Sequence, residues 1–217
     1  MSLRRLMVGG NWKSNGTMSF AKSFPAEVLN GLKFDASKVE VVVAPTALHL
    51  GTVQANVTNK DVHVATQNLS LTGNGAFTGE LSAGMVQEAG IKYTLTGHSE
   101  RRALYGETDA DVAKKTKTAL DHGMTVLACI GESLQERESG KTDDVNARQL
   151  NAILAECPDW KNIVIAYEPV WAIGTGVVAT PEVAQETHEQ IRKWLAANVS
   201  ADAAKTVRIL YGGSVTD

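Results

Sequence analysis

The clearest pattern along the chain is an alternation of short apolar runs with longer amphipathic stretches. Runs of this kind are typical of strands buried in a parallel sheet, and they cover Leu6–Gly10, Val39–Val43, Val62–Thr66, Tyr93–Thr96, Thr125–Cys129, Ile163–Tyr167 and Val207–Tyr211. Helical patterns lie between them, at about 18–30, 46–56, 80–89, 107–122, 144–156 and 180–197. This strict order predicts an α/β fold with a parallel sheet, either open and doubly wound or closed into a barrel.

Local signals support the ends of these helices. Thr180 can cap a helix whose first residue is Pro181, where a proline is tolerated. Asp143 and Asp144 place negative charge at a helix start, which the helix dipole favours. The two glycines that follow helical runs, Gly90 and Gly123, suit the position that ends a helix.

Polar residues collect directly after the predicted strands. They are Asn11 and Lys13 after the first, Gln67 and Asn68 after the third, His98, Ser99 and Glu100 after the fourth, Gly131 and Glu132 after the fifth, Glu168 after the sixth, and Gly212, Gly213 and Ser214 after the seventh. Such groups converge on one mouth in a closed barrel, whereas an open sheet gathers them at one crevice. The pattern favours the barrel, although polar residues after strands are also ordinary loop residues.

The most informative segment is 163–176. Its strand is apolar at every position, and Glu168 places a carboxylate where that strand ends. The loop beyond contains a heavy apolar anchor, Trp171, and two possible pivots, Gly174 and Gly176. A carboxylate before a loop that can hinge suits a catalytic base under a lid, and closure would raise its proton affinity by desolvation. Taken alone, the segment fits a solvated glutamate in an ordinary loop equally well.

Three further groups fit the same chemistry. His98 stands between a strand and a helix start, where the dipole favours a neutral, hydrogen-bond-donating imidazole. Lys13 could bind an anionic substrate, and the backbone N–H groups of residues 212–214 could hold a phosphate. Each has an ordinary alternative: a surface or core histidine, a solvated lysine, a plain turn. Their joint placement at one mouth favours an active site.

A dinucleotide-binding motif is a possible alternative for Gly174–Ala179, which matches the pattern G-x-G-x-x-A before a helix. The first glycine of that motif follows its strand directly, but here residues 169–173 intervene. The acidic residue expected about 20 positions on is also missing, since Leu195–Ala197 stands there. The pattern therefore does not indicate a dinucleotide site.

Composition narrows the function further. With 217 residues, of which 43% are apolar and 21% charged, the chain is expected to form one domain over 1–217. A net charge of −3 and a pI near 6.0 do not show the excess of positive charge that is typical of nucleic-acid-binding proteins. No run is long enough to span a membrane, and the first residues lack a signal-peptide pattern. Cys129 and Cys157 have no metal-ligand spacing, so we expect reduced thiols, no metal and a cytoplasmic protein.

Over essentially its whole length the chain resembles the triosephosphate isomerase family. The resemblance is carried by six ordered segments: Gly10–Lys13, Gly75–Glu80, Gly97–Arg102, Ala128–Glu132, Ala166–Gly176 and Tyr211–Val215. It implies a (β/α)8 TIM barrel that interconverts dihydroxyacetone phosphate and D-glyceraldehyde 3-phosphate in glycolysis and gluconeogenesis, without metal or cofactor. It also implies a homodimer through the 67–80 loop. The charge and the apolar runs described above lead us to expect that the protein binds neither nucleic acid nor membrane.

The resemblance implies a role for each site residue. This family is itself the standard example of a glutamate base paired with a neutral histidine, so Glu168 would move the proton through an enediol(ate) while His98 polarises the carbonyl. Lys13 and Asn11 would bind the substrate and steady the oxyanion, and Glu100 matches a further site carboxylate. Gly174, Gly213 and Ser214 would bind the phosphate.

The lid implied by the resemblance runs over Pro169, Val170, Trp171, Ala172, Ile173, Gly174, Thr175, Gly176, Val177, Val178 and Ala179. Tyr211 and Ser214 would hold it shut, and Glu132 would meet Trp171 when it is open. In the loop from Gln67 to Glu80, Thr78 would reach the partner subunit's site.

Two departures from the family pattern lead to further expectations. Val177 stands where the family usually has lysine, which is expected to shift the balance between open and closed lid at most. The family's last helix, eighth strand and final helix cannot be mapped, so we expect a barrel truncated after the seventh strand. The alternatives to an active isomerase are a catalytically inactive fragment that needs a complementing carboxyl-terminal segment, and a phosphate-binding barrel of another activity. The second does not explain Lys13, His98 and Glu168 together.

Overall fold

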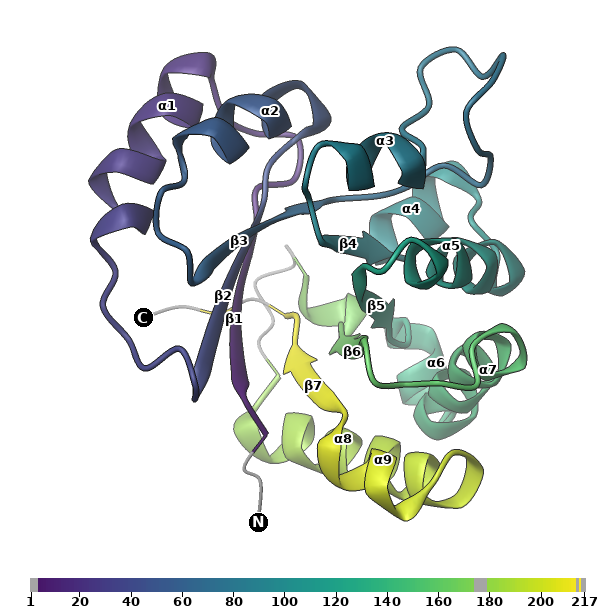
Figure 1. Cartoon of the computed structure of the whole chain (residues 1–217). Helices are drawn as coiled ribbons and strands as arrows, with labels where there is room; N and C mark the ends of the chain where they lie inside the picture. Colours follow the sequence, from purple (N-terminus) through teal and green to yellow (C-terminus); the bar gives the residue numbers. More distant parts are fainter. Residues whose placement is uncertain (1–3, 174–178, 214, 216–217) are drawn as a thin grey trace. The chain divides into compact units, whose positions relative to one another are not determined.

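The computed structural model of the chain describes residues 4–173, 179–213 and 215. Its strands, shown in Figure 1, are β1 (Leu6–Asn11), β2 (Val39–Ala44), β3 (Val62–Thr66), β4 (Tyr93–Thr96), β5 (Thr125–Ile130), β6 (Ile163–Tyr167) and β7 (Arg208–Tyr211). Every predicted strand is confirmed, with ends that agree to within one residue. Their order in the sheet follows the sequence.

The helices agree less closely with the prediction. They are α1 (Met18–Glu27), η1 (Leu29–Gly31), α2 (Ala47–Asn56), α3 (Ala83–Glu88), α4 (Ser99–Tyr105), α5 (Asp109–Asp121), α6 (Leu134–Glu138), α7 (Thr142–Glu156), η2 (Val170–Ala172), α8 (Pro181–Asn198) and α9 (Ala201–Thr206). Four of them, α4, α6, η2 and α9, lie outside the predicted helical ranges, although the start of α4 after His98 was expected. They span only 7, 5, 3 and 6 residues, too short for a helical period to show in the sequence.

The predicted helix ends are confirmed. The Thr180 hydroxyl accepts the Val183 N–H at 3.4 Å, and Pro181 opens α8. Asp143 and Asp144 lie in the first turn of α7. The two glycines after helices, Gly90 and Gly123, have φ values of 75° and 72°, which only glycine adopts readily.

The chain divides into two compact units, and each is described by itself. Unit 1 comprises Met1–Thr96 and Thr118–Val126, and unit 2 comprises Gly97–Lys117 and Leu127–Asp217. In unit 1, β1 to β4 pair in parallel, with Val8 opposite Val41 and Val43 opposite Val64. In unit 2, β6 pairs in parallel with β7, with Ile165 opposite Ile209.

Burial differs sharply between strands. All five residues of β6 are buried, as its unbroken apolar sequence predicts for a strand covered on both faces. On β1, by contrast, Leu6 is 66% exposed and Val8 60%. This exposure follows from the place of β1 at the end of the strand order, where it pairs with β2 alone among the described strands.

Long-range polar contacts fix the start of unit 1. Glu40 on β2, 2% exposed, accepts a hydrogen bond from Arg5 at 2.7 Å and another from the Tyr93 hydroxyl at 2.8 Å. A buried carboxylate needs such donors to offset its loss of hydration. In the part of the chain that the structure describes, no helix is long and apolar enough to cross a membrane.

Candidate active site

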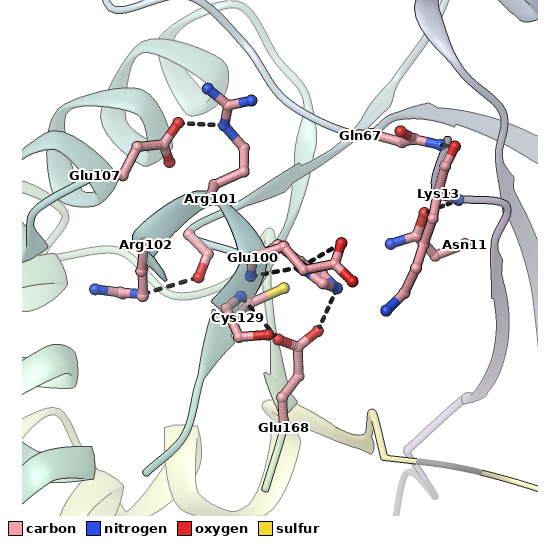
Figure 2. Close-up of polar contacts among 12 residues, drawn as sticks. Asn11, Lys13, Gln67, Glu100, Arg101, Arg102, Glu107, Cys129 and Glu168 are labelled. Atoms are coloured by element: carbon pink, nitrogen blue, oxygen red, sulfur yellow. Dashed lines mark hydrogen bonds and ion pairs between the residues drawn. The ribbon is translucent and has the colours of Figure 1, made fainter. Parts of the chain in front are cut away.

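Glu168 lies in unit 2 directly after β6, at the centre of a small polar cluster. Its side chain is almost fully buried, with the residue 5% exposed. Oε1 lies 3.2 Å from Nε2 of His98, and Oε2 accepts the backbone N–H of Ser99 at 3.1 Å. In Figure 2, dashed lines mark contacts that end on the Glu168 carboxylate. The structure therefore brings the predicted base and the predicted electrophile into direct contact.

Burial changes the pKa of this carboxyl group. It raises the pKa of Glu168 above the ordinary value, because removing the charged form from water is unfavourable. The contacts with His98 and Ser99 lower this pKa and oppose only part of the shift. A carboxylate with raised proton affinity is a stronger base than one in water.

His98 occupies the N-cap of α4, and its ring orientation follows from that position. Nδ1 accepts the backbone N–H of Glu100 at 3.2 Å, as an N-cap side chain does. With Nδ1 as the acceptor of this bond, Nε2 is the ring nitrogen that can donate a hydrogen bond. That N–H points at the Glu168 carboxylate and is the donor that carbonyl polarisation requires.

Polar contacts of two arginines stabilise the turn that contains His98. Gly97 has a φ of 68°, and a Cβ there would lie 2.7 Å from Cγ1 of Val112. Arg102 donates to the Gly97 carbonyl at 2.9 Å and to Asp109 at 2.5 Å. Its neighbour Arg101 pairs with Glu107 (Figure 2). These contacts fix the turn and with it the start of α4.

The first residues of the predicted lid are tethered to Glu132, which follows β5 and is fully buried. Its carboxylate accepts hydrogen bonds at 3.0 Å from the Tyr167 hydroxyl, Nε1 of Trp171 and Arg137. The Arg137 guanidinium also lies 5.0 Å from the centre of the Trp171 ring. The predicted contact between Glu132 and Trp171 is thus present.

The rest of the lid is described only in part. Pro169 caps η2, Ala172 and Ala179 are buried, and Ile173 follows η2. Gly174, Thr175, Gly176, Val177 and Val178 lie outside the described residues, as does Ser214.

Residues after β7 approach the base closely. Gly212 donates its N–H to the Tyr167 carbonyl at 2.7 Å, and a Cβ on Gly212 would lie 2.9 Å from Cγ of Glu168. A larger residue there would displace the carboxylate. The hydroxyl of Tyr211 is buried and has no hydrogen-bond partner among the described residues, and a Cβ on Gly213 would collide with that ring.

Asn11 and Lys13 lie together at the end of β1 in unit 1. Asn11 Oδ1 accepts the Lys13 N–H at 2.9 Å, and Lys13 has a φ of 52°, unusual for a residue other than glycine. The Gln67 amide donates to the Lys13 carbonyl at 2.8 Å and to the Ala44 carbonyl at 2.9 Å. Gln67 thus holds the lysine in a strained backbone conformation, a feature often found at functional sites.

The sequence placed Gln67 and Ser99 after strands but assigned them no function. It also treated Cys129 only as a free thiol, whereas burial, and to a lesser extent the nearby Glu168 carboxylate, raise the pKa of this thiol well above its ordinary value. The position of each residue at a strand's carboxyl end was the available signal. Among the described residues, no cluster of His, Cys, Asp or Glu could hold a metal ion.

Comparison with known proteins identifies the family. A family model described as triosephosphate isomerase matches residues 6–217. The chain belongs to the triosephosphate isomerase family. Its predicted TIM-barrel class is thereby confirmed, and so is the resemblance carried by the six segments.

Individual relatives agree with this assignment. The triosephosphate isomerase of Emericella nidulans is 53% identical over 217 residues, covering 99% of this chain and 86% of the relative. The cytosolic triosephosphate isomerase of Oryza sativa subsp. japonica is 50% identical, with 98% and 84% covered. A chloroplastic triosephosphate isomerase from Secale cereale is 49% identical, with 97% and 70% covered. These similarities support an isomerase and not the alternative of an inactive fragment.

Proposed function

We propose that this member of the family interconverts dihydroxyacetone phosphate and D-glyceraldehyde 3-phosphate, with Glu168 as the base and His98 as the electrophile. The observation that carries the proposal is the buried Glu168 carboxylate, whose Oε1 lies 3.2 Å from Nε2 of His98. A base and a hydrogen-bond donor side by side are what proton transfer next to a carbonyl requires.

The proton steps follow from this geometry. Glu168 takes the proton from the carbon next to the substrate carbonyl, while Nε2–H of His98 donates to the carbonyl oxygen. The product is an enediol(ate). The hydroxyl oxygen then gives its proton to His98 and becomes the new carbonyl, while Glu168 returns its proton to the carbon of the former carbonyl. Because the carboxylate is buried and desolvated, its pKa is raised, which favours the first step.

Substrate binding is assigned to residues around these two. Lys13 and Asn11 bind the substrate and stabilise its developing negative charge, and Glu100 acts as a further carboxylate of the site. The backbone strain at Lys13 supports a functional role for that residue. Gly174, Gly213 and Ser214 bind the phosphate.

The lid over 169–179 closes on the bound phosphate and excludes water, so that the enediolate does not lose phosphate. In this proposal Tyr211 and Ser214 hold the closed lid. Glu132 holds the open one through Trp171, and the hydrogen bond between these two residues supports this assignment.

The assembly and the location complete the proposal. The chain forms a homodimer through the 67–80 loop, where Thr78 is exposed and Phe77 is 46% exposed. It acts in the cytoplasm, like the cytosolic rice relative, in glycolysis and gluconeogenesis.

A coupled isomerase assay on protein of verified intact mass tests the proposal. We expect robust turnover of the chain as printed. Absence of turnover in folded protein would contradict the activity, and turnover that survives replacement of Glu168 would contradict the assignment of the base.

A further inference from the structure

A buried glutamine on α7 binds the backbone beside the catalytic cluster. Gln149 is 4% exposed, and its amide makes two hydrogen bonds to one residue of unit 2, Gly131. Its Oε1 accepts the Gly131 N–H at 2.9 Å, and its Nε2 donates to the Gly131 carbonyl at 3.2 Å. One side chain thus satisfies both backbone groups of the residue that follows β5, and it fixes the orientation of both adjacent peptides.

Gly131 in turn touches the backbone of the base. A Cβ on Gly131 would collide with the carbonyl oxygen of Glu168 and would lie 2.7 Å from its carbonyl carbon. No side chain fits in this space, so the two backbones are in direct contact. A rotation of the Gly131 peptides would therefore press on the Glu168 carbonyl.

Backbone hydrogen bonds flank this contact on both sides. Glu168 donates its N–H to the Ile130 carbonyl at 2.7 Å, and Val170 donates to the Glu132 carbonyl at 3.1 Å. Two backbone hydrogen bonds thus join residues 130–132 to residues 168–170, and Gly131 lies between the two acceptor residues. Gln149 makes its side-chain hydrogen bonds to this central residue, Gly131.

We propose that Gln149 is a positioning residue for Glu168, and this inference rests on the proposed function. It holds Gly131 so that the Glu168 carboxylate stays within hydrogen-bond distance of His98 and Ser99. Gln149 touches neither substrate nor reacting atoms. Its effect is therefore expected in kcat, because proton transfer is sensitive to displacements of about 1 Å.

The first test is Gln149→Met, which preserves the length of the side chain and removes both hydrogen bonds. We expect kcat to fall about tenfold or more, with KM changed less than about twofold. The matched control is Asn146→Leu, one turn earlier on α7. Asn146 is also 4% exposed, but its amide has no hydrogen-bond partner among the described residues, so kcat should stay at the wild-type value.

The second test is Gln149→Glu, which remains informative if the methionine variant does not fold. A protonated carboxyl group offers one acceptor and one donor, as glutamine does, whereas a carboxylate offers no donor to the Gly131 carbonyl. The ratio of variant to wild-type kcat should therefore fall as pH rises from about 6 to about 9. A merely structural glutamine would give a ratio that does not follow this ionisation.

The outcomes separate the two proposals. If the wild type is active and Gln149→Met has the same kcat, the positioning role is overturned and the isomerase function stays intact. The same holds if the ratio of Gln149→Glu kcat to wild-type kcat does not change with pH. An inactive, folded wild type would overturn the proposed function and the positioning role with it.

Discussion

At the scale of single residues, the burial of Glu168 makes it a stronger base but lowers the stability of the folded protein. The same burial that raises the pKa of this carboxyl group makes its charged form unfavourable in the folded protein. The neighbouring donors, His98 and Ser99, offset only part of this effect. Replacing this one residue should therefore change turnover and stability in opposite directions.

Glu168→Gln removes the base while keeping the shape of the side chain. We expect kcat in the coupled assay to fall about a hundredfold to ten-thousandfold, the usual contribution of a general base. The circular dichroism spectrum should be unchanged. Glu138→Gln, at the exposed end of α6, is the control and should retain full turnover. Turnover of Glu168→Gln close to wild type would rule out this base.

The same variant should be more stable than the wild type at neutral pH. Because the pKa of Glu168 is raised on folding, the folded state binds this proton more tightly than the unfolded state does. Its ionisation therefore destabilises the fold as pH rises above the ordinary pKa of 4.5. Urea unfolding should show a stability gain for Glu168→Gln at about pH 8 that shrinks as pH approaches 4.5; an equal gain at both values would contradict the pKa shift.

Asn146 allows a test of how much a buried amide without a hydrogen-bond partner lowers the stability of the fold. Both polar atoms of its amide are buried on α7 without a hydrogen-bond partner among the described residues. An unsatisfied buried amide costs about 1–3 kcal/mol, so Asn146→Leu should raise the free energy of unfolding by about 1 kcal/mol. Thermal and urea unfolding would measure the gain. A loss of stability would show that this amide has a partner in solution.

At the scale of elements, Glu132 ties the end of β5 to the end of β6 and to η2. Its carboxylate is the acceptor for Tyr167, Trp171 and Arg137. Glu132→Leu leaves three donors without this acceptor and should lower the free energy of unfolding by about 3 kcal/mol. The exposed Glu138→Ala should change it by less than about 0.5 kcal/mol. Equal effects in urea unfolding would contradict the role of Glu132 as a tether.

The elements also show how far local pattern predicts structure. The strands were predicted almost to the residue, because β-rich apolar runs bounded by polar residues carry the signal locally. The short helices α6 and α9 were not, and of α4 only the start after His98 was, since each is too short for a helical period and is set by its cap. Ser133 and Ser200 supply those caps for α6 and α9, and only the cap signal could have revealed them.

At the scale of the whole molecule, the proposed dimer can be tested by mass. We expect sedimentation at twice the chain mass of 23.2 kDa. Thr78→Arg places a bulky charge in the proposed contact and should shift the protein to the single-chain mass at micromolar concentration. Lys33→Ala, at an exposed position of unit 1, is the control and should leave the mass unchanged. Sedimentation of the wild type as a monomer would contradict the dimer.

The sequence by itself determined the order of the strands, the family and the candidate residues at the strand ends. These are properties of short segments, and local patterns and motifs carry them. Apart from the expected contact of Glu132 with Trp171, it did not determine which of these residues meet. The contacts of Glu168 with Ser99 and of Gln149 with Gly131 join residues 69 and 18 positions apart.

Only the tertiary structure decided these contacts, because packing within unit 2 brings distant segments together and excludes water from them. That exclusion also decides the chemistry. The carboxyl group of Glu168 is a site of raised pKa only when β6, the turn after β4 and the residues after β7 surround it. The same glutamate in an isolated peptide would titrate normally.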